Sequence, residues 1–387
     1  MDYIYADHAA TTPILPEALD AMKPWLCESF GNASSLYKYG TKARKAVENA
    51  RRKVCALLGA QYDEIFFTSG GTESNVSALR GCADAGLRRF ACSEIEHHSV
   101  INTVRRLGEL GFETSYLKPD PSGVVLPESA AEAARENALV SVMYANNETG
   151  AIQPIADIAK AVHAKGGLFH CDCVQAAGHV PLNFGASGID IASFSAHKFG
   201  GPKGCGILYI RRGTPFKPLM TGGAQEWNTR AGTENVAGIV GMVTALETSI
   251  ESMESEKARL LAEKQCLIEN VLKIPYSHLL STAENTLPGI VCLSFDYTVG
   301  ENIATVMDQK GAAVSPGSAC AAGMHEPSHV LTAMGLDRDT AMSAVRISLG
   351  RETKAGDGER IAALLKETVD FLRFLNPEWR ERNENGI

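Results

Sequence analysis

Short apolar runs separated by amphipathic segments occupy the chain from about residue 64 to residue 245. The apolar runs predict strands over residues 64–70, 88–95, 138–146, 167–174, 189–196 and 205–212. The amphipathic segments predict helices over residues 72–86, 97–110 and 155–167. Buried strands that alternate with helices are typical of a mostly parallel sheet covered on both faces. The pattern therefore predicts a large α/β domain over residues 15–245.

The rest of the chain has a different pattern. A long charged segment, residues 245–273, predicts one helix with a solvated face that leads into a second domain. Predicted strands and helices then mix, and the last residues, 376–387, read as a frayed polar tail. We expect a smaller α+β domain built from residues 1–14 and 246–387.

Composition narrows the class of protein. The chain has 387 residues, of which 45% are hydrophobic and 21% charged, and its net charge is −8. These values fit a globular protein of two domains and argue against a nucleic-acid coat or an anionic membrane surface. The first residues carry Asp2 and Asp7 and no basic n-region, and no apolar run approaches the roughly 20 residues that span a bilayer. We therefore expect a cytoplasmic protein with no membrane and no direct nucleic-acid partner.

The ten cysteines are scattered along the chain. In a reducing compartment we expect most of them to be free thiols. Cys171 and Cys173 stand two residues apart in a predicted strand, which places both on one face, and we expect them in the core. No second Cys/His pair stands at zinc-finger spacing, so we expect no metal site.

Polar residues follow several predicted strands, where ligands of parallel α/β sheets bind. Gly70 and Gly71 allow close approach of backbone to a ligand, and Thr72 opens a helix whose N–H groups suit a phosphate. Two glycines at a helix start are common, so this signal alone is weak. The segment matches neither the Walker pattern nor G-x-G-x-x-G.

Asp172 and Lys198 end predicted strands, with one connection and one strand between them. A lone Asp at a strand end is most often a cap or a turn former. Asp followed by Lys one strand later is also the arrangement of pyridoxal-phosphate enzymes, in which the carboxylate faces a cationic ring nitrogen and the lysine holds the aldehyde. Ser195 and His197 stand beside Lys198 and can reach a phosphate.

Other segments have two interpretations each. His97 and His98 follow a strand, where a histidine can cap a helix or can stack on a cofactor and move protons. The segment ANNETG has the composition of a turn. Cys320 lies among Gly, Ser and Ala, which favours an accessible nucleophile over a structural thiol.

Taken together, these motifs resemble the cysteine desulfurases of the NifS and IscS type, in the class V aminotransferase group of fold-type I pyridoxal-phosphate enzymes. The resemblance covers nearly the whole chain and rests on the following motifs in the family's order: YADHAATTP, FGNASS, FTSGGTESN, EHHSV, ANNETG, HCDCVQAAG, SFSAHKFGGPKG, RAGTENV, GSAC and VRISLGRET. It implies a large domain with a mostly parallel seven-stranded sheet between helices, plus a smaller α+β domain carrying the Cys320 loop. The cysteine setting R-x-G-H-x-C of the SufS branch is absent.

The resemblance also implies roles for individual residues. It makes Lys198 the Schiff-base lysine for pyridoxal 5'-phosphate, His97 the ring-stacking acid and base, and Cys320 the cysteine that forms a persulfide. The remaining assignments are Asp172 to the ring nitrogen, Gln175 to the ring hydroxyl, Asn147 near the ring, Gly71, Thr72, Ser195 and His197 to the phosphate, Thr233 to the partner subunit's cofactor, and Asn32 and Arg346 to the substrate carboxylate. Pro316 and Trp227 depart from the family pattern.

The implied activity is removal of sulfur from L-cysteine, which leaves L-alanine and a persulfide on Cys320. The sulfur then passes to an acceptor protein, such as an iron–sulfur scaffold or a thiolation enzyme, and the implied assembly is a homodimer. A plain aminotransferase or β-lyase, a selenocysteine lyase and an inactive scaffold are the alternatives. The GSAC loop argues against the first, and the intact Lys198, Asp172 and His97 argue against the last.

Overall fold

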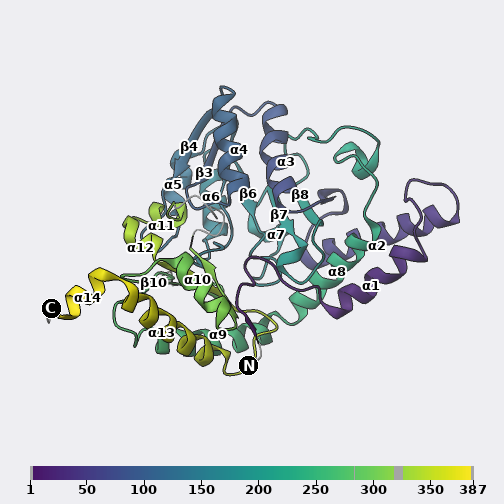
Figure 1. Ribbon diagram of the computed structural model, residues 1–387. Helices are drawn as coiled ribbons and strands as arrows, with labels where there is room; N and C mark the ends of the chain where they lie inside the picture. The colour runs from purple at the N-terminus through teal and green to yellow at the C-terminus, as the bar shows by residue number, and fades with distance from the viewer. Residues whose placement is uncertain (1–2, 283, 318–325, 385–387) are drawn as a thin grey trace.

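The structure is a computed structural model that describes residues 3–282, 284–317 and 326–384. A seven-stranded sheet and its helices form one part, and two smaller sheets with the C-terminal helices form the other (Figure 1). The strands are β1 (Ile4–Tyr5), β2 (Ile65–Thr68), β3 (Arg89–Ser93), β4 (Glu113–Leu117), β5 (Ala138–Ser141), β6 (Leu168–Asp172), β7 (Ile191–Ser195), β8 (Gly206–Ile210), β9 (Ser277–Leu279), β10 (Ile290–Phe295), β11 (Ala312–Ala313), β12 (Ser315–Pro316) and β13 (Ala344–Ser348).

The helices alternate with these strands over most of the chain. They are α1 (Pro16–Cys27), α2 (Lys38–Leu58), α3 (Gly71–Asp84), α4 (His98–Glu109), α5 (Pro127–Ala133), α6 (Ile155–His163), α7 (Phe184–Ser187), α8 (Val236–Glu251), α9 (Met253–Val271), α10 (Gly300–Gln309), α11 (His329–Ala333), α12 (Arg338–Met342), α13 (Asp357–Leu375) and α14 (Pro377–Glu384).

The large sheet has the strand order β2-β8-β7-β6-β5-β3-β4, and only β8 runs antiparallel to its neighbours. Its two faces follow the alternation of side chains along each strand. On β2, Phe66 packs with α3 and α4, whereas Ile65 and Phe67 pack into the larger core on the opposite face. This confirms the predicted mostly parallel sheet between helices.

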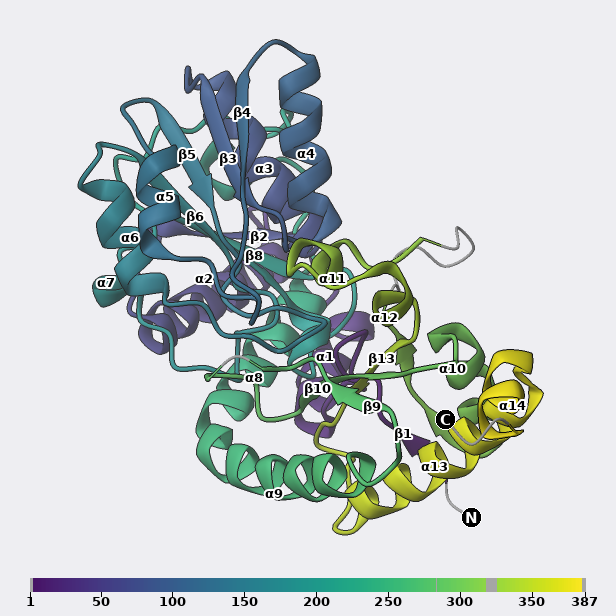
Figure 2. The same ribbon diagram turned by 90° about the vertical axis from the view of Figure 1, so that its left-hand side faces the viewer.

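The second part holds the antiparallel sheet β12-β13-β10-β9 and the parallel pair β1-β11. Ile4 and Ala6 from the N-terminus pack in one core with residues of α9, α10 and α13. Figure 2 places β1 beside α13. The N-terminal strand thus shares the C-terminal core, and the domain limits at residues 14 and 245 stay predictions.

The predicted single helix over residues 245–273 is wrong, because the structure breaks it at Ser252 into α8 and α9, which meet at 68°. The Ser252 hydroxyl donates to the carbonyl of Thr248 at 2.7 Å and also contacts Arg351. A serine that bonds back to the preceding turn favours a bend. The predicted solvated face is also wrong at Lys264, which is buried and donates to Thr286 and to the carbonyl of Leu287.

The predicted polar tail contains a helix, α14. Trp379 lies against the rings of Tyr276 and Tyr297, at centroid distances of 5.6 and 5.2 Å. Arg382 donates to both tyrosine hydroxyls. The polar composition of the segment did not predict this packing, because a single tryptophan supplies most of the apolar contact.

Among the described residues, no single helix is long and apolar enough to cross a membrane, although the bent pair α8 and α9 together meets that test by length and composition. The nine described cysteines are free thiols. Cys171 and Cys173 are buried, which confirms the predicted core position.

Candidate active site

A cavity lies at the carboxyl ends of the central strands, beside the start of α3 and the N-terminal segment. Most residues predicted for the site line it. They are Gly71, Thr72, His97, Asn147, Asp172, Gln175, Ser195, His197, Lys198 and Arg346. The structure therefore brings together predicted site residues that are up to 275 residues apart in the sequence (Gly71 to Arg346).

The helix α3 begins at the wall of this cavity. Gly70 lies in the connection between β2 and α3 and has φ +149°, in the region that favours glycine. A Cβ atom on Gly71 would lie 2.7 Å from the Val174 side chain, so the helix start needs glycine for space. The backbone N–H groups of the first turn suit an anion, and Thr72 and Ser195 add hydroxyl groups.

Asp172, the last residue of β6, is a buried carboxylate with two hydrogen bonds. It accepts from the Asn75 side-chain amide at 2.7 Å and from the backbone N–H of Val174 at 2.9 Å. It forms no ion pair with another described residue. A buried carboxylate is costly without a cation, so Asp172 fits a ligand that brings a positive charge.

His97 caps the start of α4. Its Nδ1 accepts from the backbone N–H of Ser99 at 3.1 Å, and the Ser99 hydroxyl in turn accepts from Asn75 at 2.9 Å. Burial lowers the pKa of His97, although nearby Asp172 opposes the shift. The imidazole is therefore neutral at physiological pH and is able to accept a proton.

The N-terminal segment, defined here as residues 7–12, crosses the site and bonds to several of its side chains. The Lys198 ammonium donates to the carbonyls of Ala9 and Ala10 at 2.6 and 2.9 Å. Gln175 donates to the carbonyl of Ala9 at 2.9 Å. His197 Nδ1 lies 3.1 Å from the Thr11 hydroxyl, and burial lowers the pKa of His197 to about 4, so this imidazole is neutral.

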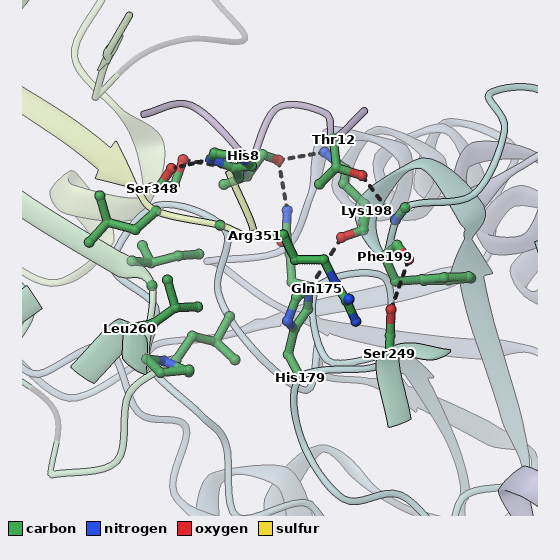
Figure 3. Close-up of a pocket in the computed structure, with 18 of the residues that line it drawn as sticks. His8, Thr12, Gln175, His179, Lys198, Phe199, Ser249, Leu260, Ser348 and Arg351 are labelled. Atoms are coloured by element: carbon green, nitrogen blue, oxygen red, sulfur yellow. Dashed lines mark hydrogen bonds between the residues drawn. The ribbon is translucent and has the colours of Figure 1, made fainter. Parts of the chain in front are cut away.

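A second cavity is also lined by residues of this segment, among them His8 and Thr12 (Figure 3). Ala9, Gln175 and Lys198 line both cavities. Behind them His179 bonds to the carbonyl of Lys198 at 3.2 Å. The His179 side chain thus helps to fix the backbone of the lysine.

Arg346 reaches the site from β13, in the C-terminal part of the chain. Its Nη1 donates to the carbonyl of Asn147 at 3.0 Å, and its Nη2 lies 2.7 Å from Asp7 Oδ1. The neighbouring Asn146 accepts from the backbone of Glu148 and Thr149, which confirms the predicted turn. Asn147 therefore contributes its backbone carbonyl to the position of Arg346.

Three predicted site residues are not among those lining the cavity. Asn32 lies exposed in the connection between α1 and α2, where its side chain accepts from the backbone of Ser34. Thr233 is exposed as well. Cys320 lies outside the described residues. Their roles stay predictions.

The sequence analysis missed several contacts of the site. Asp7, Thr11, Asn75 and Ser99 carry hydrogen bonds to predicted site residues. Asn75 stands one helical turn after Gly71, and that spacing was the available signal. No comparable signal marked Asp7, because its contact depends on pairing between the two ends of the chain. Among the described residues no group of three or more His, Cys, Asp or Glu side chains could hold a metal ion.

Comparison with known proteins agrees with this geometry. The aminotransferase class-V family model matches residues 4–361. The cysteine desulfurase IscS of Methanosarcina thermophila is 43% identical over 97% of this chain and 94% of its own length. A solved structure of a NifS-like protein has a TM-score of 0.90 and 36% identity and covers 95% of this chain and 100% of that one. A structure of SspA in complex with cysteine has a TM-score of 0.79 and 34% identity and covers 89% and 98%.

The family model spans most of the chain, and the relatives align over at least 94% of their own lengths, so the resemblance predicted from the motifs is confirmed. The chain belongs to the aminotransferase class-V family and, within it, to the cysteine desulfurases of the NifS and IscS type.

Proposed function

We propose that the protein is a pyridoxal-phosphate-dependent cysteine desulfurase that converts L-cysteine to L-alanine and retains the sulfur on Cys320. One observation carries the proposal. The buried Asp172 has no ion-pair partner among the described residues and lies in one cavity with Lys198 and the start of α3. A ligand with a cationic ring, an aldehyde and a phosphate matches these three features at once.

The residues present fit pyridoxal phosphate. The start of α3 at Gly71 and Thr72, together with Ser195 and the neutral His197, would hold the phosphate. Asp172 would keep the ring nitrogen protonated, and Gln175 would donate to the ring hydroxyl. When bound, the cofactor supplies an electron sink for the negative charge that develops on the substrate.

The chain's own residues would carry the other steps. Arg346 binds the substrate carboxylate, with Asn32 assigned to the same group. The Lys198 amine moves the α-proton, and the neutral His97 accepts or returns a proton. The Cys320 thiolate attacks the substrate sulfur. A sulfur–sulfur bond forms as the carbon–sulfur bond breaks, the carbon keeps the electron pair, and a proton completes alanine.

The test is to supply the protein with pyridoxal phosphate and L-cysteine, and then to measure alanine and the mass of the tryptic peptide that contains residue 320. We expect one alanine for each sulfur transferred and a persulfide on that peptide. Lys198→Ala should abolish both. Cys320→Ser should abolish the persulfide and most of the alanine, whereas Cys27→Ser, which removes an exposed thiol, should change neither.

A plain aminotransferase or β-lyase would keep its turnover in Cys320→Ser, and that result would contradict the proposed sulfur transfer. Selenocysteine, the other substrate considered, is distinguished by comparing kcat/KM for the two amino acids on the wild-type protein.

We also propose a cytoplasmic homodimer that delivers sulfur to an acceptor protein, such as an iron–sulfur scaffold or a thiolation enzyme. An apolar surface on α1, the following connection and the start of α2 supports the dimer, because large exposed apolar surfaces are rare on monomers. Its exposed members are Leu26, Phe30, Leu36, Tyr37 and Tyr39. Thr233, exposed outside the cavity, is then free to reach the partner's cofactor.

A further inference from the structure

The guanidinium of Arg346 is buried and incompletely bonded. The residue is only 4% exposed and lines the cavity. Two of its nitrogens are engaged, Nη1 with the carbonyl of Asn147 and Nη2 with Asp7, while Nε is buried with no hydrogen-bond partner among the described residues. An unpaired buried donor on a cation is costly. The guanidinium of Arg346 therefore has N–H groups left for one more acceptor.

Asp7 is held beside Arg346 by backbone pairing. Asp7 and Ser348 form a parallel bridge, in which the N–H of His8 donates to the carbonyl of Ser348 at 3.0 Å and the N–H of Ser348 donates to the carbonyl of Ala6 at 2.8 Å. The Tyr5 hydroxyl donates to the backbone carbonyl of Asp7 at 3.1 Å. Three hydrogen bonds thus fix the backbone around Asp7, and two of them join it to β13.

Asp7 is also the main negative charge on the arginine. It forms the ion pair with Arg346 at 2.7 Å. The other nearby carboxyl, Glu148, has its pKa raised to about 7 by burial, and it accepts from the Ser328 hydroxyl. Glu148 is therefore protonated in a large share of molecules at neutral pH and is a weak counter-ion.

We propose that Asp7 is a positioning residue that fixes Arg346 for the substrate carboxylate. The inference rests on the proposed function, since it concerns the substrate of that same site. Asp7 and the carbonyl of Asn147 each engage one terminal nitrogen, so the planar fork has one orientation and the second N–H group of each terminal nitrogen stays available. A ligand carboxylate then binds without ordering a long, flexible side chain.

Asp7 also has an opposite effect, because it competes with the substrate carboxylate for Arg346. Asp7 reduces the net charge that a substrate carboxylate meets, so its removal could strengthen binding. However, an arginine has five donors, and the single contact with Asp7 leaves most of them unused. Without Asp7 the buried cation loses its fixed partner, and removal of one member of a buried pair is strongly unfavourable. Positioning therefore outweighs competition.

The test uses two ligands on the protein loaded with pyridoxal phosphate. The first, 3-mercaptopropionate, carries the thiol and the carboxylate of cysteine but no amine, and the second, cysteamine, carries the thiol and the amine but no carboxylate. We expect Asp7→Ala to raise the dissociation constant of 3-mercaptopropionate by about 10-fold or more, the range for a charge-assisted hydrogen bond. Cysteamine affinity should stay within about twofold of wild type. The KM for cysteine should rise far more than kcat falls.

Two further variants keep the test decisive. Asp7→Asn retains an acceptor for Arg346 and should restore part of the lost affinity. Glu352→Gln removes a carboxylate that contacts His8, the neighbour of Asp7 in the N-terminal segment. This variant should leave the affinity for both ligands unchanged. Unchanged or tighter binding of 3-mercaptopropionate to Asp7→Ala, or equal weakening of both ligands, would overturn the inference. A wild-type protein that makes no alanine would instead contradict the proposed function.

Discussion

His170 is a buried histidine between two serine hydroxyl groups, on β6 and two residues before Asp172. Its Nδ1 lies 2.7 Å from Ser141 Oγ and its Nε2 lies 3.1 Å from Ser193 Oγ. A neutral ring accepts from one hydroxyl and donates to the other. Burial lowers the pKa of His170 from 6.5 to about 3, because the cation would lose its hydration.

This shift predicts how stability depends on pH. Below pH 6.5 His170 is protonated in the unfolded chain, whereas in the native protein its ring stays neutral until the pH falls to about 3. The free energy of unfolding therefore falls as the pH falls through this window, by up to about 1.4 kcal/mol per pH unit from this residue. Urea unfolding of His170→Asn at pH 7.5, 6.5 and 5.5 should show a shallower decline than the wild-type protein.

His278 offers the matched control, since it pairs with Asp296 at the surface and is half exposed. His278→Asn should keep the wild-type pH dependence more closely than His170→Asn does. An identical decline in wild type and His170→Asn would show that the proton uptake comes from other groups.

The residues of the site that could be predicted from the sequence share one property: each follows a strand or opens a helix in a recognisable motif. Lys198, Asp172 and His97 were found in this way, and the structure places them in one cavity. Asp7 and Asn75 were given no role although both lie in the motifs YADHAATTP and FTSGGTESN, because the partners of their side chains are distant in the sequence. Hydrogen bonds between distant segments are properties of the tertiary fold.

At the scale of elements, the turn over residues 226–228 stands out. Glu226, Trp227 and Asn228 have φ values of 48°, 52° and 65°, in the left-handed region that non-glycine residues avoid. The buried Glu226 carboxylate compensates, since it pairs with Arg51 at 2.7 Å and accepts from the N–H of Phe67 at 3.0 Å. The turn leads directly into the segment that carries Thr233.

We expect Glu226→Gln to destabilise the protein by about 3 kcal/mol or more, because it leaves the buried Arg51 without its counter-ion. The reference is Asp63→Asn, which breaks the exposed pair with Arg212 and should cost about 1 kcal/mol or less. Chemical unfolding of both variants gives the comparison. A loss for Glu226→Gln no greater than for Asp63→Asn would show that the turn is held by other contacts, such as Trp227 over Arg51.

The elements that pattern alone identified are the buried strands and the helices between them, where the period of apolar residues is clear. Predictions from the period of apolar residues were wrong where a single side chain determines the local structure. The composition predicted one continuous helix where the structure has a bend at Ser252. It also predicted a frayed polar tail where Trp379 packs against other aromatic rings. The edge strand β4 was also missed, because four of its five residues are not buried and its apolar signal is weak.

For the whole molecule, the proposed homodimer makes a test of shared sites possible. Lys198→Ala should inactivate the site that contains it, and Thr233→Ala should weaken the cofactor site of the partner subunit. A hybrid dimer of the two variants should then contain one native site and recover part of the alanine production, whereas each variant alone should not. Absence of recovery, when mass spectrometry shows that hybrids form, would contradict a shared site.

The pairing of Asp7 with Arg346 also affects how the protein is made. A ribosome synthesises Asp7 first and Arg346 some 340 residues later, and β1 cannot pair before β11, at Ala312–Ala313, has emerged. A nascent chain can fold its large sheet early, yet it lacks a complete binding site for a carboxylate until the chain is almost finished. Because the proposed carboxylate site needs both Asp7 and Arg346, we expect a nascent chain that has not reached residue 346 to be unable to hold the substrate carboxylate.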